Sequence, residues 1–446
     1  MANSRKSNSA NFTDRVAAQI APLIPAHSCI LIGLSGGVDS VVLLHVLLTL
    51  AKRFSWKLSA VHVHHGISPH ADAWAAFCAD LCATHNIPLH IEKVDITPLR
   101  AQGIEAAARQ LRHAAFARQH CDFVALAHHA DDQVETLLLQ LLRGAGVRGA
   151  SAMPIISERT GLPCLIRPLL DFSRREIFEY ATTHELRWIE DESNADDNYP
   201  RNFLRHRVLP LLGEKFPAYR DTFTRSVQHF AEASGLLDEL AQLDAAQVIE
   251  GETLAVAALQ ALSPPRAKNL LRYFLHGCGA PMPQAVQLDD MLQQLCHARQ
   301  DALVCIAYSG WQVRRYQGKI YALRALGEFD SNLVLPWRGE AELDWPALNA
   351  RLQFKPSQAI GISLAKLQRA PVTIRLRQGG ETLRPHLNAT TRTVKNLLQE
   401  NRVPPWQRQR LPLLYCGADL VCVAGVAVAA EYQAVAGEAG ISMVYS

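Results

Sequence analysis

Short apolar runs alternate with segments of helical periodicity from Cys29 to about His184, and this alternation restricts the fold more than any other feature of the chain. Strands covered on both faces are apolar throughout, so strands that alternate with helices predict a parallel α/β sheet. The expected strands are 29–34, 58–64, 89–94 and 123–128. The expected helices are 41–54, 70–85, 104–120, 131–143 and 173–184, the last capped by Ser173.

The pattern changes after Pro217, so we assign residues 1–216 to the N-terminal α/β domain. Helical periodicity then predicts a mainly helical domain over 217–330, with helices at 222–243, 265–276 and 283–297 and strands at 302–308 and 312–323. Residues 331–369 indicate a linker with irregular strand. Residues 370–446 predict a small α/β domain, in which strands 372–376 and 420–428 flank a helix at 393–401.

Composition excludes several classes of protein. With 49% hydrophobic and 20% charged residues in 446, the chain can bury more than one core and is not disordered. The longest apolar stretches, 41–51 and 421–430, are shorter than the roughly 20 residues of a membrane-spanning helix. Residues 1–11 lack the apolar core of a secretion signal and predict a frayed tail. The ten cysteines include no C-x-x-C pair, which favours reduced thiols and a cytoplasmic protein.

A glycine-rich turn, Ser35-Gly36-Gly37-Val38-Asp39-Ser40, stands between the first strand and the first long helix. Glycines let the backbone curl so that N–H groups and the helix dipole face an anion, and the turn therefore predicts a phosphate site. An ordinary strand-to-helix turn is the alternative. The loop lacks the Gly-Lys-Ser/Thr ending of a Walker A motif and is not a dinucleotide fingerprint.

A second polar run, His-His-Ala-Asp-Asp-Gln-Val-Glu-Thr at 128–136, follows the strand that ends near His128. Ligands of parallel sheets bind at the carboxyl ends of strands, so we expect this run and the glycine loop to line one crevice. Asp132 and Glu135 are three residues apart and should share one face of a helix near its positive end, although simple capping is the alternative. Two histidine pairs leave a zinc site as a further alternative: His64, His65, His128 and His129.

These motifs carry a family resemblance. The loop at 35–40 resembles that of the PP-loop ATP pyrophosphatases, which cleave ATP between the α and β phosphates. The run at 128–136, followed by Arg143-Gly144-Ala145-Gly146, resembles the tRNA(Ile)-lysidine synthetase family within that group. The similarity extends over most of the chain. Further similar blocks contain Glu105, Arg109 and Arg112, residues 167–176, residues 188–205, and residues 377–408.

The resemblance implies a PP-loop (adenine nucleotide α-hydrolase-like) fold for the N-terminal domain and a ligase activity. In this family the C2 oxygen of the wobble cytidine of tRNA(Ile) with a CAU anticodon attacks the α phosphate of ATP. Lysine then displaces AMP to give lysidine, and the codon read changes from AUG to AUA, so that the tRNA identity changes from Met to Ile. The implied cofactors are ATP and Mg²⁺, and the implied partners are L-lysine and this tRNA, with no membrane. A homodimer is left open.

The resemblance also implies roles for particular residues. The ATP-binding set consists of Ser35, Gly36, Gly37, Val38, Asp39 and Ser40, with Arg109 and Arg112 neutralising further phosphate charge. Asp39 is the first candidate ligand of Mg²⁺ and the first candidate catalytic residue. Lysine arrives as an ammonium ion with an ordinary pKa near 10.4, so the site must hold a cation and remove a proton. We expect Asp132 and Glu135 to be the lysine-binding and catalytic carboxylates.

A basic segment near the C-terminus predicts an RNA surface. Residues 369–410 contain nine Lys or Arg against two Glu, a local charge of +7 in a chain whose total is +3. A solvated basic face is the alternative. We expect four residues to contact tRNA: Arg205, Arg377, Lys395 and Arg408. Rival functions are a tRNA thiolase, which usually needs a reactive cysteine or C-x-x-C, a small-molecule ligase, and a noncatalytic tRNA-binding protein.

Overall fold

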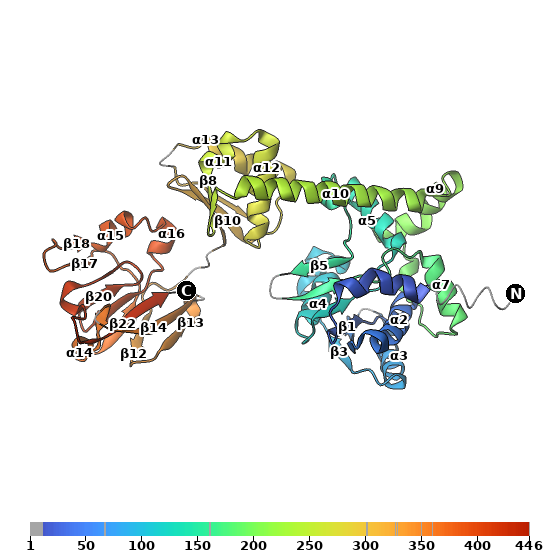
Figure 1. The fold of residues 1–446 in the computed structure, drawn as a ribbon, viewed down its shortest axis with the longest axis horizontal. Coiled ribbons are helices and arrows are strands. Elements are labelled where there is room, and N and C mark those ends of the chain that lie inside the picture. The colour runs from blue at the N-terminus through green and yellow to red at the C-terminus, as the bar shows by residue number, and fades with distance from the viewer. Residues whose placement is uncertain are drawn as a thin grey trace. The chain divides into compact units, whose positions relative to one another are not determined.

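The computed structural model describes residues 12–66, 68–159, 162–299, 302–325, 327, 329–348, 350–358 and 360–445. The tail expected at 1–11 lies outside these residues. The chain divides into two compact units, the first ending at Leu240 and the second beginning at Ala241 (Figure 1). The limits of the four predicted domains stay predictions.

The first unit is built on a six-stranded sheet in the order β3-β2-β1-β4-β6-β5. The strands are β1 Cys29–Gly33, β2 Lys57–His64, β3 Leu89–Lys93, β4 Phe123–Ala125, β5 Ile156–Arg159 and β6 Leu162–Ile166. All neighbouring pairs are parallel except β5 with β6. The parallel α/β sheet expected from the alternating pattern is therefore confirmed, with two strands beyond the four expected: β6, which is parallel, and β5, which is antiparallel at the edge.

Helices cover both faces of this sheet. These helices are α2 Val38–Phe54, α3 Ala71–Thr84, α4 Ile104–Ala117 and α7 Arg174–Thr183. Two further helices, α5 Ala130–Leu142 and α6 Val147–Ala150, pack instead on residues between Leu209 and Val227. Successive residues of a strand face opposite sides, and β1 accordingly contributes Ile30 and Ile32 to a core with α2 and α7, but Leu31 to a core with α4. The predicted cap is confirmed, because Ser173 Oγ accepts a hydrogen bond from the Glu176 N–H at the start of α7.

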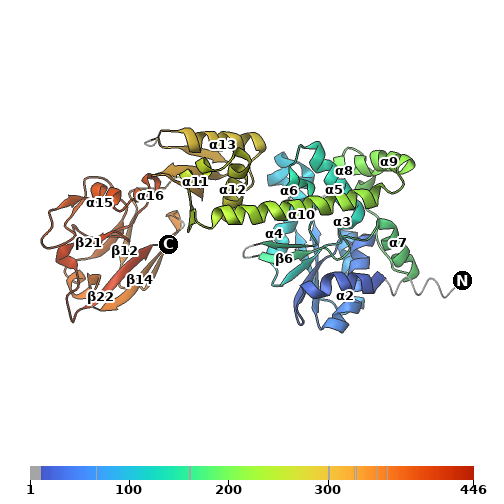
Figure 2. The same ribbon diagram turned by 45° about the horizontal axis from the view of Figure 1, so that its top comes forward.

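The end of the first unit carries a rare backbone feature. Helix α8 (Pro200–Phe203) continues into a π-helical turn, η4 (Leu204–Val208), and then into α9 (Leu209–Lys215). A long continuous helix, α10 (Tyr219–Ala245), follows (Figure 2). Leu209 and Tyr219 are buried against Val134 of α5, so this region packs directly on the helix that carries Asp132 and Glu135.

The second unit begins with helices and strands that share one core. The helices are α11 Val256–Ala261, α12 Pro264–Gly277 and α13 Ala285–His297. The strands are β7 Ile249–Glu250, β8 Thr253–Ala255, β9 Cys305–Tyr308, β10 Trp311–Tyr316 and β11 Lys319–Arg324. The single strand expected at 312–323 is wrong, because the chain reverses at Gln317 and Gly318, whose φ angles are +48° and +74°. Such angles form the tight turn of a β-hairpin, so this region contains more strand than its helical pattern indicates.

The remainder of the second unit consists mostly of antiparallel strands. One sheet contains β12 Val334–Trp337, β16 Val372–Arg375, β19 Leu413–Cys416, β20 Asp419–Val423 and β21 Ala427–Val428. Another contains β13 Glu342–Trp345, β14 Ala350–Gln358, β15 Ile362–Ser363 and β22 Ala439–Tyr445, and a small ribbon pairs β17 Thr382–Leu383 with β18 Arg392–Thr393. Three short helices join them, α14 Leu364–Leu367, α15 Val394–Glu400 and α16 Pro405–Arg408.

The expectation of a linker with irregular structure at 331–369 does not hold. Strands β12 to β15 lie there, and Trp345 and Leu352 are buried in the same core as Ile374 and Leu414. Prolines and charged residues interrupt the apolar alternation of this segment, which hides strands that bury only one face.

Two further observations concern the chain as a whole. Among the described residues, no helix is both long and apolar enough to cross a membrane. The ten cysteines are free. Cys78 and Cys82 are close enough in sequence to suggest a metal site, but both lie on α3 and are buried in the core that also contains α2.

Candidate functional site

The glycine loop curls tightly between β1 and α2, and its serines bind its own backbone. Ser40 Oγ accepts a hydrogen bond from the Gly36 N–H (3.1 Å) and donates to the Gly37 carbonyl (2.9 Å). Ser35 Oγ donates to Ser40 Oγ (3.1 Å) and accepts from the Gly37 N–H. Gly37 is the N-cap of α2, so the loop ends where a helix presents N–H groups and the positive end of its dipole.

Two observations explain the glycine at position 36. Its φ of +89° lies in the region that side chains rarely adopt, and a Cβ atom there would lie 2.5 Å from Cδ1 of Ile189. In addition, the Ile189 N–H donates to the Gly36 carbonyl (3.0 Å). A segment far along the chain thus fixes the bend of the loop.

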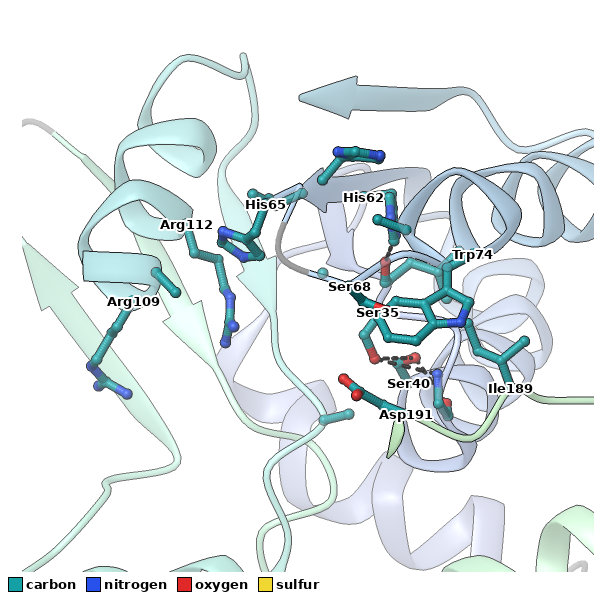
Figure 3. A pocket seen from close by; sticks show the side chains of 18 of the residues that line it. Ser35, Ser40, His62, His65, Ser68, Trp74, Arg109, Arg112, Ile189 and Asp191 are labelled. Atoms are coloured by element: carbon teal, nitrogen blue, oxygen red, sulfur yellow. Dashed lines mark hydrogen bonds between the residues drawn. The ribbon is translucent and has the colours of Figure 1, made fainter. Parts of the chain in front are cut away.

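The loop opens on a cavity of about 750 Å³ at the carboxyl ends of β1, β2 and β4 (Figure 3). Of the residues predicted to bind ATP, Ser35, Gly37, Asp39 and Ser40 line this cavity, and Arg109 and Arg112 reach it from α4. Gly36 and Val38 complete the loop but are not among the lining residues. The side chain of Glu105 lies outside the described residues.

Three histidines of the cavity wall, His62, His65 and His128, have lowered pKa values. Burial lowers the pKa of His65 to about 4 and the pKa of His128 to about 3. Burial also lowers the pKa of His62, although the hydrogen bond between its Nδ1 and the Leu34 carbonyl opposes this. The positive charge available to an anion in this cavity therefore comes from arginines and backbone N–H groups.

Asp39 carries an unsatisfied buried atom. Within the part of the chain that the structure describes, its Oδ1 has no hydrogen-bond partner, and burial raises the pKa of the carboxyl above its ordinary value. The nearest cation-forming group is His129, whose Nε2 is 3.9 Å away. Mg²⁺ is commonly bound by one or two carboxylates together with substrate phosphates, so this oxygen fits such an ion. The described residues contain no group of three or more His, Cys, Asp or Glu placed to hold a metal, as a zinc site would require.

Helix α5 begins with a reciprocal cap that fixes Asp132. The N–H of His129 donates to Asp132 Oδ2 (3.1 Å), and the Asp132 N–H donates to His129 Nδ1 (3.4 Å). Burial would raise the pKa of Asp132, but His129, His128 and Arg201 more than offset this and the pKa lies below its ordinary value.

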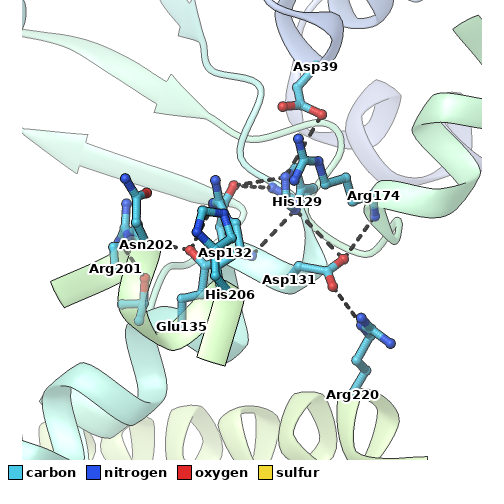
Figure 4. Close-up of polar contacts among 12 residues, drawn as sticks. Asp39, His129, Asp131, Asp132, Glu135, Arg174, Arg201, Asn202, His206 and Arg220 are labelled. Carbon is cyan, nitrogen blue, oxygen red and sulfur yellow. Dashed lines mark hydrogen bonds and ion pairs between the residues drawn. The ribbon is translucent and has the colours of Figure 1, made fainter. Parts of the chain in front are cut away.

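Asp132 and Glu135 do share one face of α5, as predicted (Figure 4). Arg205 forms ion pairs with both carboxylates. Arg205 Nε donates to Glu135 Oε1 (2.7 Å), and its Nη2 donates to Glu135 Oε2 (3.0 Å) and Asp132 Oδ1 (3.3 Å). The Glu135 side chain is 1% exposed, and burial raises its pKa against the opposing effect of Arg205. The expected shared crevice is formed in part: His128 of the run lines the cavity together with the glycine loop, whereas Asp132 and Glu135 are not among the lining residues.

Arg201 connects the acidic pair with the cavity wall, which it lines. It lies one helical turn before Arg205, its Nε is 3.5 Å from Glu135 Oε2, and its Nη2 donates to Thr136 Oγ1 (3.0 Å). Sequence reasoning did not single out Arg201, although its spacing of four from Arg205 could have indicated that both arginines share one face.

The residues predicted to contact RNA differ in their surroundings. Lys395 is exposed on α15. Arg377 is mostly buried beside Glu381, with 3.5 Å between Nε and Oε2. Arg408 donates from Nε to the Val403 carbonyl (2.8 Å) and from Nη2 to the Tyr316 hydroxyl (2.8 Å). Trp406, a possible aromatic surface, packs against Tyr321 and under the Arg314 guanidinium.

Comparisons with known proteins match this chain along most of its length. Family models match at residues 8–212 (PP-loop domain), 254–321 (TilS substrate binding domain) and 372–445 (TilS substrate C-terminal domain). The tRNA(Ile)-lysidine synthase of Nitrosomonas europaea is 42% identical over 443 residues, which cover 99% of this chain and 97% of that protein. The chain belongs to the tRNA(Ile)-lysidine synthase family. The relative from Escherichia coli O157:H7 is 40% identical over 429 residues, covering 93% and 96% of the two chains.

Among solved structures, the U34-tRNA thiolase NcsA from Methanococcus maripaludis is 18% identical to this chain, with a TM-score of 0.44 over 51% of this chain and 80% of that one.

Within this member of the tRNA(Ile)-lysidine synthase family, two features that the motifs alone did not reveal organise the site. Ile189 belongs to the matched PP-loop domain but acts on a loop about 150 residues earlier, through a backbone hydrogen bond and a side-chain contact. Arg205 is turned inward onto Glu135 rather than outward, so its predicted contact with tRNA stays a prediction.

Proposed function

We propose that this chain joins L-lysine to C2 of the wobble cytidine of tRNA(Ile) with a CAU anticodon and converts ATP to AMP and pyrophosphate. Membership of the tRNA(Ile)-lysidine synthase family supports this function, and the glycine loop that opens on the cavity beside Asp39 carries it structurally. Conversion of the cytidine to lysidine changes the codon read from AUG to AUA and the tRNA identity from Met to Ile. The reaction takes place in the cytoplasm.

The loop is proposed to bind the phosphates of ATP. In this proposal its backbone N–H groups, the N-terminus of α2 and the hydroxyls of Ser35 and Ser40 stabilise the negative charge that grows on the departing pyrophosphate. Arg109 and Arg112 add positive charge from α4, while His65 and His128, whose pKa values burial lowers to about 4 and about 3, add none at neutral pH. The α phosphate is then attacked by the C2 oxygen of the cytidine, and pyrophosphate leaves.

Asp39 is the proposed ligand of Mg²⁺, because its buried Oδ1 has no hydrogen-bond partner among the described residues and oxygen is the donor this ion prefers. When bound, Mg²⁺ neutralises phosphate charge and makes the phosphorus a better electrophile. Asp39 itself fixes where a cation lies relative to the loop.

Asp132 and Glu135 are the proposed receptors of the lysine ammonium, and one of them accepts the proton that the attacking amine must lose. Their position on α5, tied to Asp39 through His129, places them near the phosphate loop. Because Arg205 occupies both carboxylates in this structure, lysine must compete with a guanidinium for them.

The tRNA is proposed to lie on the basic segment 369–410, with Lys395, Arg377 and Arg408 as contacts and Arg205 as a fourth. A cytidine that reacts at C2 has to leave its stack, and an anticodon loop, being single-stranded, allows this. A homodimer, which the sequence leaves open, can be tested by sedimentation of the full chain.

The test is a transfer assay with purified full-length protein, ATP, Mg²⁺, radiolabelled lysine and tRNA(Ile) with a CAU anticodon. We expect labelled lysine in the RNA, with one pyrophosphate released per lysine. A tRNA that differs only in carrying uridine at the wobble position is the control and should stay unlabelled. Folded protein that leaves the CAU tRNA unlabelled would refute the proposal, and sulfur in the product would identify a thiolase instead.

A further inference from the structure

Four charged side chains pair with one another beside the cavity. Asp132 and Glu135 supply two carboxylates, and Arg201 and Arg205 supply two guanidinium groups. Their side chains are 12%, 1%, 26% and 21% exposed, in that order. The charges within the cluster cancel, and both oxygens of Glu135 are already engaged by Arg205.

This balance restricts how lysine can bind. If an ammonium group joined the two carboxylates while both arginines stayed, the cluster would hold three positive charges against two negative ones in a mostly buried place. Burying an uncompensated charge is far more costly than exchanging one ion pair for another. One guanidinium therefore has to leave when the ammonium arrives.

Arg205 is the arginine suited to leave. It contacts the two carboxylates directly, whereas Arg201 is farther from Glu135 and is also held by Thr136. Arg205 lies in the π-helical turn 204–208, and single π turns are rare and frequently found at functional sites. Arg201 already lines the cavity, and its Nε is buried without a hydrogen-bond partner in the described part of the chain.

We propose that Arg205 determines specificity for the amino acid by an exchange of ion pairs. One ammonium group of lysine takes the place of Arg205 on Asp132 and Glu135, and the released guanidinium binds the α-carboxylate of the same lysine. During binding the exchange keeps the charges paired, because the ammonium replaces one guanidinium on the carboxylates and that guanidinium pairs with the α-carboxylate. This inference rests on the proposed function. It identifies the carboxylate of the substrate, and not its amines alone, as a recognised group.

Cadaverine tests the exchange, because it is lysine without the carboxylate. The measurement compares the KM for lysine with the inhibition constant of cadaverine against lysine, using full-length protein, ATP and the CAU tRNA. The wild type should prefer lysine strongly. Arg205→Ala should reduce this preference at least about tenfold, because only lysine loses a charge-assisted, bidentate partner. Arg205→Lys, which keeps the charge but not the planar fork, should give an intermediate preference.

Arg207→Ala is the matched control. Arg207 is two residues farther along, is 69% exposed and pairs with Asp197, so its loss should leave the preference unchanged. If the Arg205 variants weaken the binding of lysine and of cadaverine by the same factor, Arg205 only stabilises the acidic pair and the inference is wrong. If Arg205→Ala does not fold, as a melting curve would reveal, an unchanged preference in Arg205→Lys is sufficient to reject it. Absence of lysine transfer by the wild type would instead refute the proposed function.

Discussion

The imidazole Nε2 of His129 lies 3.9 Å from the carboxylate Oδ1 of Asp39. The same ring accepts the Asp132 N–H at the start of α5. One histidine therefore connects the phosphate loop after β1 with the acidic helix after β4, although about 90 residues separate them in sequence. The two halves of the proposed reaction, activation by ATP and attack by lysine, meet at this contact.

Substitutions of Asp39 and of Glu135 should affect the two steps of the proposed reaction, activation by ATP and attack by lysine, separately. In Asp39→Asn, an amide replaces the proposed metal ligand, and we expect pyrophosphate release to fall by at least about 100-fold. In Glu135→Gln, pyrophosphate release should persist while the KM for lysine rises. Single-turnover assays of pyrophosphate and of labelled lysine measure the two steps. Near-normal lysine kinetics in both variants would contradict these roles.

Gly36→Ala should disrupt the loop by more than backbone strain. Gly103 has a similar φ of +93°, but a Cβ atom added there would meet no described atom within 4 Å, whereas a Cβ at Gly36 meets Ile189 at 2.5 Å. We expect Gly103→Ala to cost about 1 kcal/mol of unfolding free energy and Gly36→Ala to cost about 1–3 kcal/mol more, with loss of ATP binding. Urea unfolding and nucleotide titration measure both effects. Equal losses of unfolding free energy in the two variants would show that the Ile189 side chain moves aside at little energetic cost.

Asp131 should make stability depend on pH. Burial alone would raise its pKa, but hydrogen bonds from the Arg174 N–H (2.9 Å) and Arg220 Nε (2.6 Å) more than offset this and lower the pKa. A carboxyl with a lowered pKa stabilises the fold above its unfolded pKa of about 3.9, and this contribution is lost as the pH falls through the lower folded value.

The matching variant is Asp131→Asn. It should lower the unfolding free energy by about 1–2 kcal/mol at pH 7, and the difference from the wild type should shrink below about pH 4. Urea unfolding at pH values from 7 to 3 measures it. A difference that is constant across this range would show that the charge of Asp131 contributes nothing.

Lys395 and Arg408 should affect RNA binding in different ways. Lys395 is exposed, so Lys395→Ala should weaken tRNA binding and reduce the slope of log affinity against log salt by about 1, without changing the melting temperature. Arg408 is bonded to Val403 and Tyr316, so Arg408→Ala should also lower the melting temperature. Filter binding at several salt concentrations and thermal melting distinguish the two. An unchanged salt slope in Lys395→Ala would remove this lysine from the RNA surface.

The sequence predicts the catalytic half of the fold well, because there each local signal agrees with the tertiary structure. The central strands β1 and β4 are apolar, Ser173 has the residue type and spacing of a cap, and glycines mark the loop. The signal fails at Gln317 and Gly318, where two positive φ angles divide the strand expected at 312–323 into a hairpin. It fails again at 331–369, where Trp345 and Leu352 become core residues only through strands elsewhere in the chain.

The site was harder to predict than the fold. Residue type and spacing place Asp132 and Glu135 on one face of a helix, but they do not reveal what lies opposite. Arg205 follows Glu135 by 70 residues and reaches it through a π turn for which we found no sequence signal. The sequence around a buried carboxylate does not reveal whether the carboxylate already has a partner or is free to bind a ligand. Contacts between distant segments of the chain determine this.

The hydrogen bond between Ile189 and Gly36 has a consequence for how the protein is made. A ribosome delivers the glycine loop early and the residue that fixes its bend about 150 residues later. A nascent chain that has emerged only as far as α5 already contains both chemical motifs, yet its loop is not restrained. Competence to hold a nucleotide should therefore arise in one late step of synthesis, when the segment around Ile189 docks.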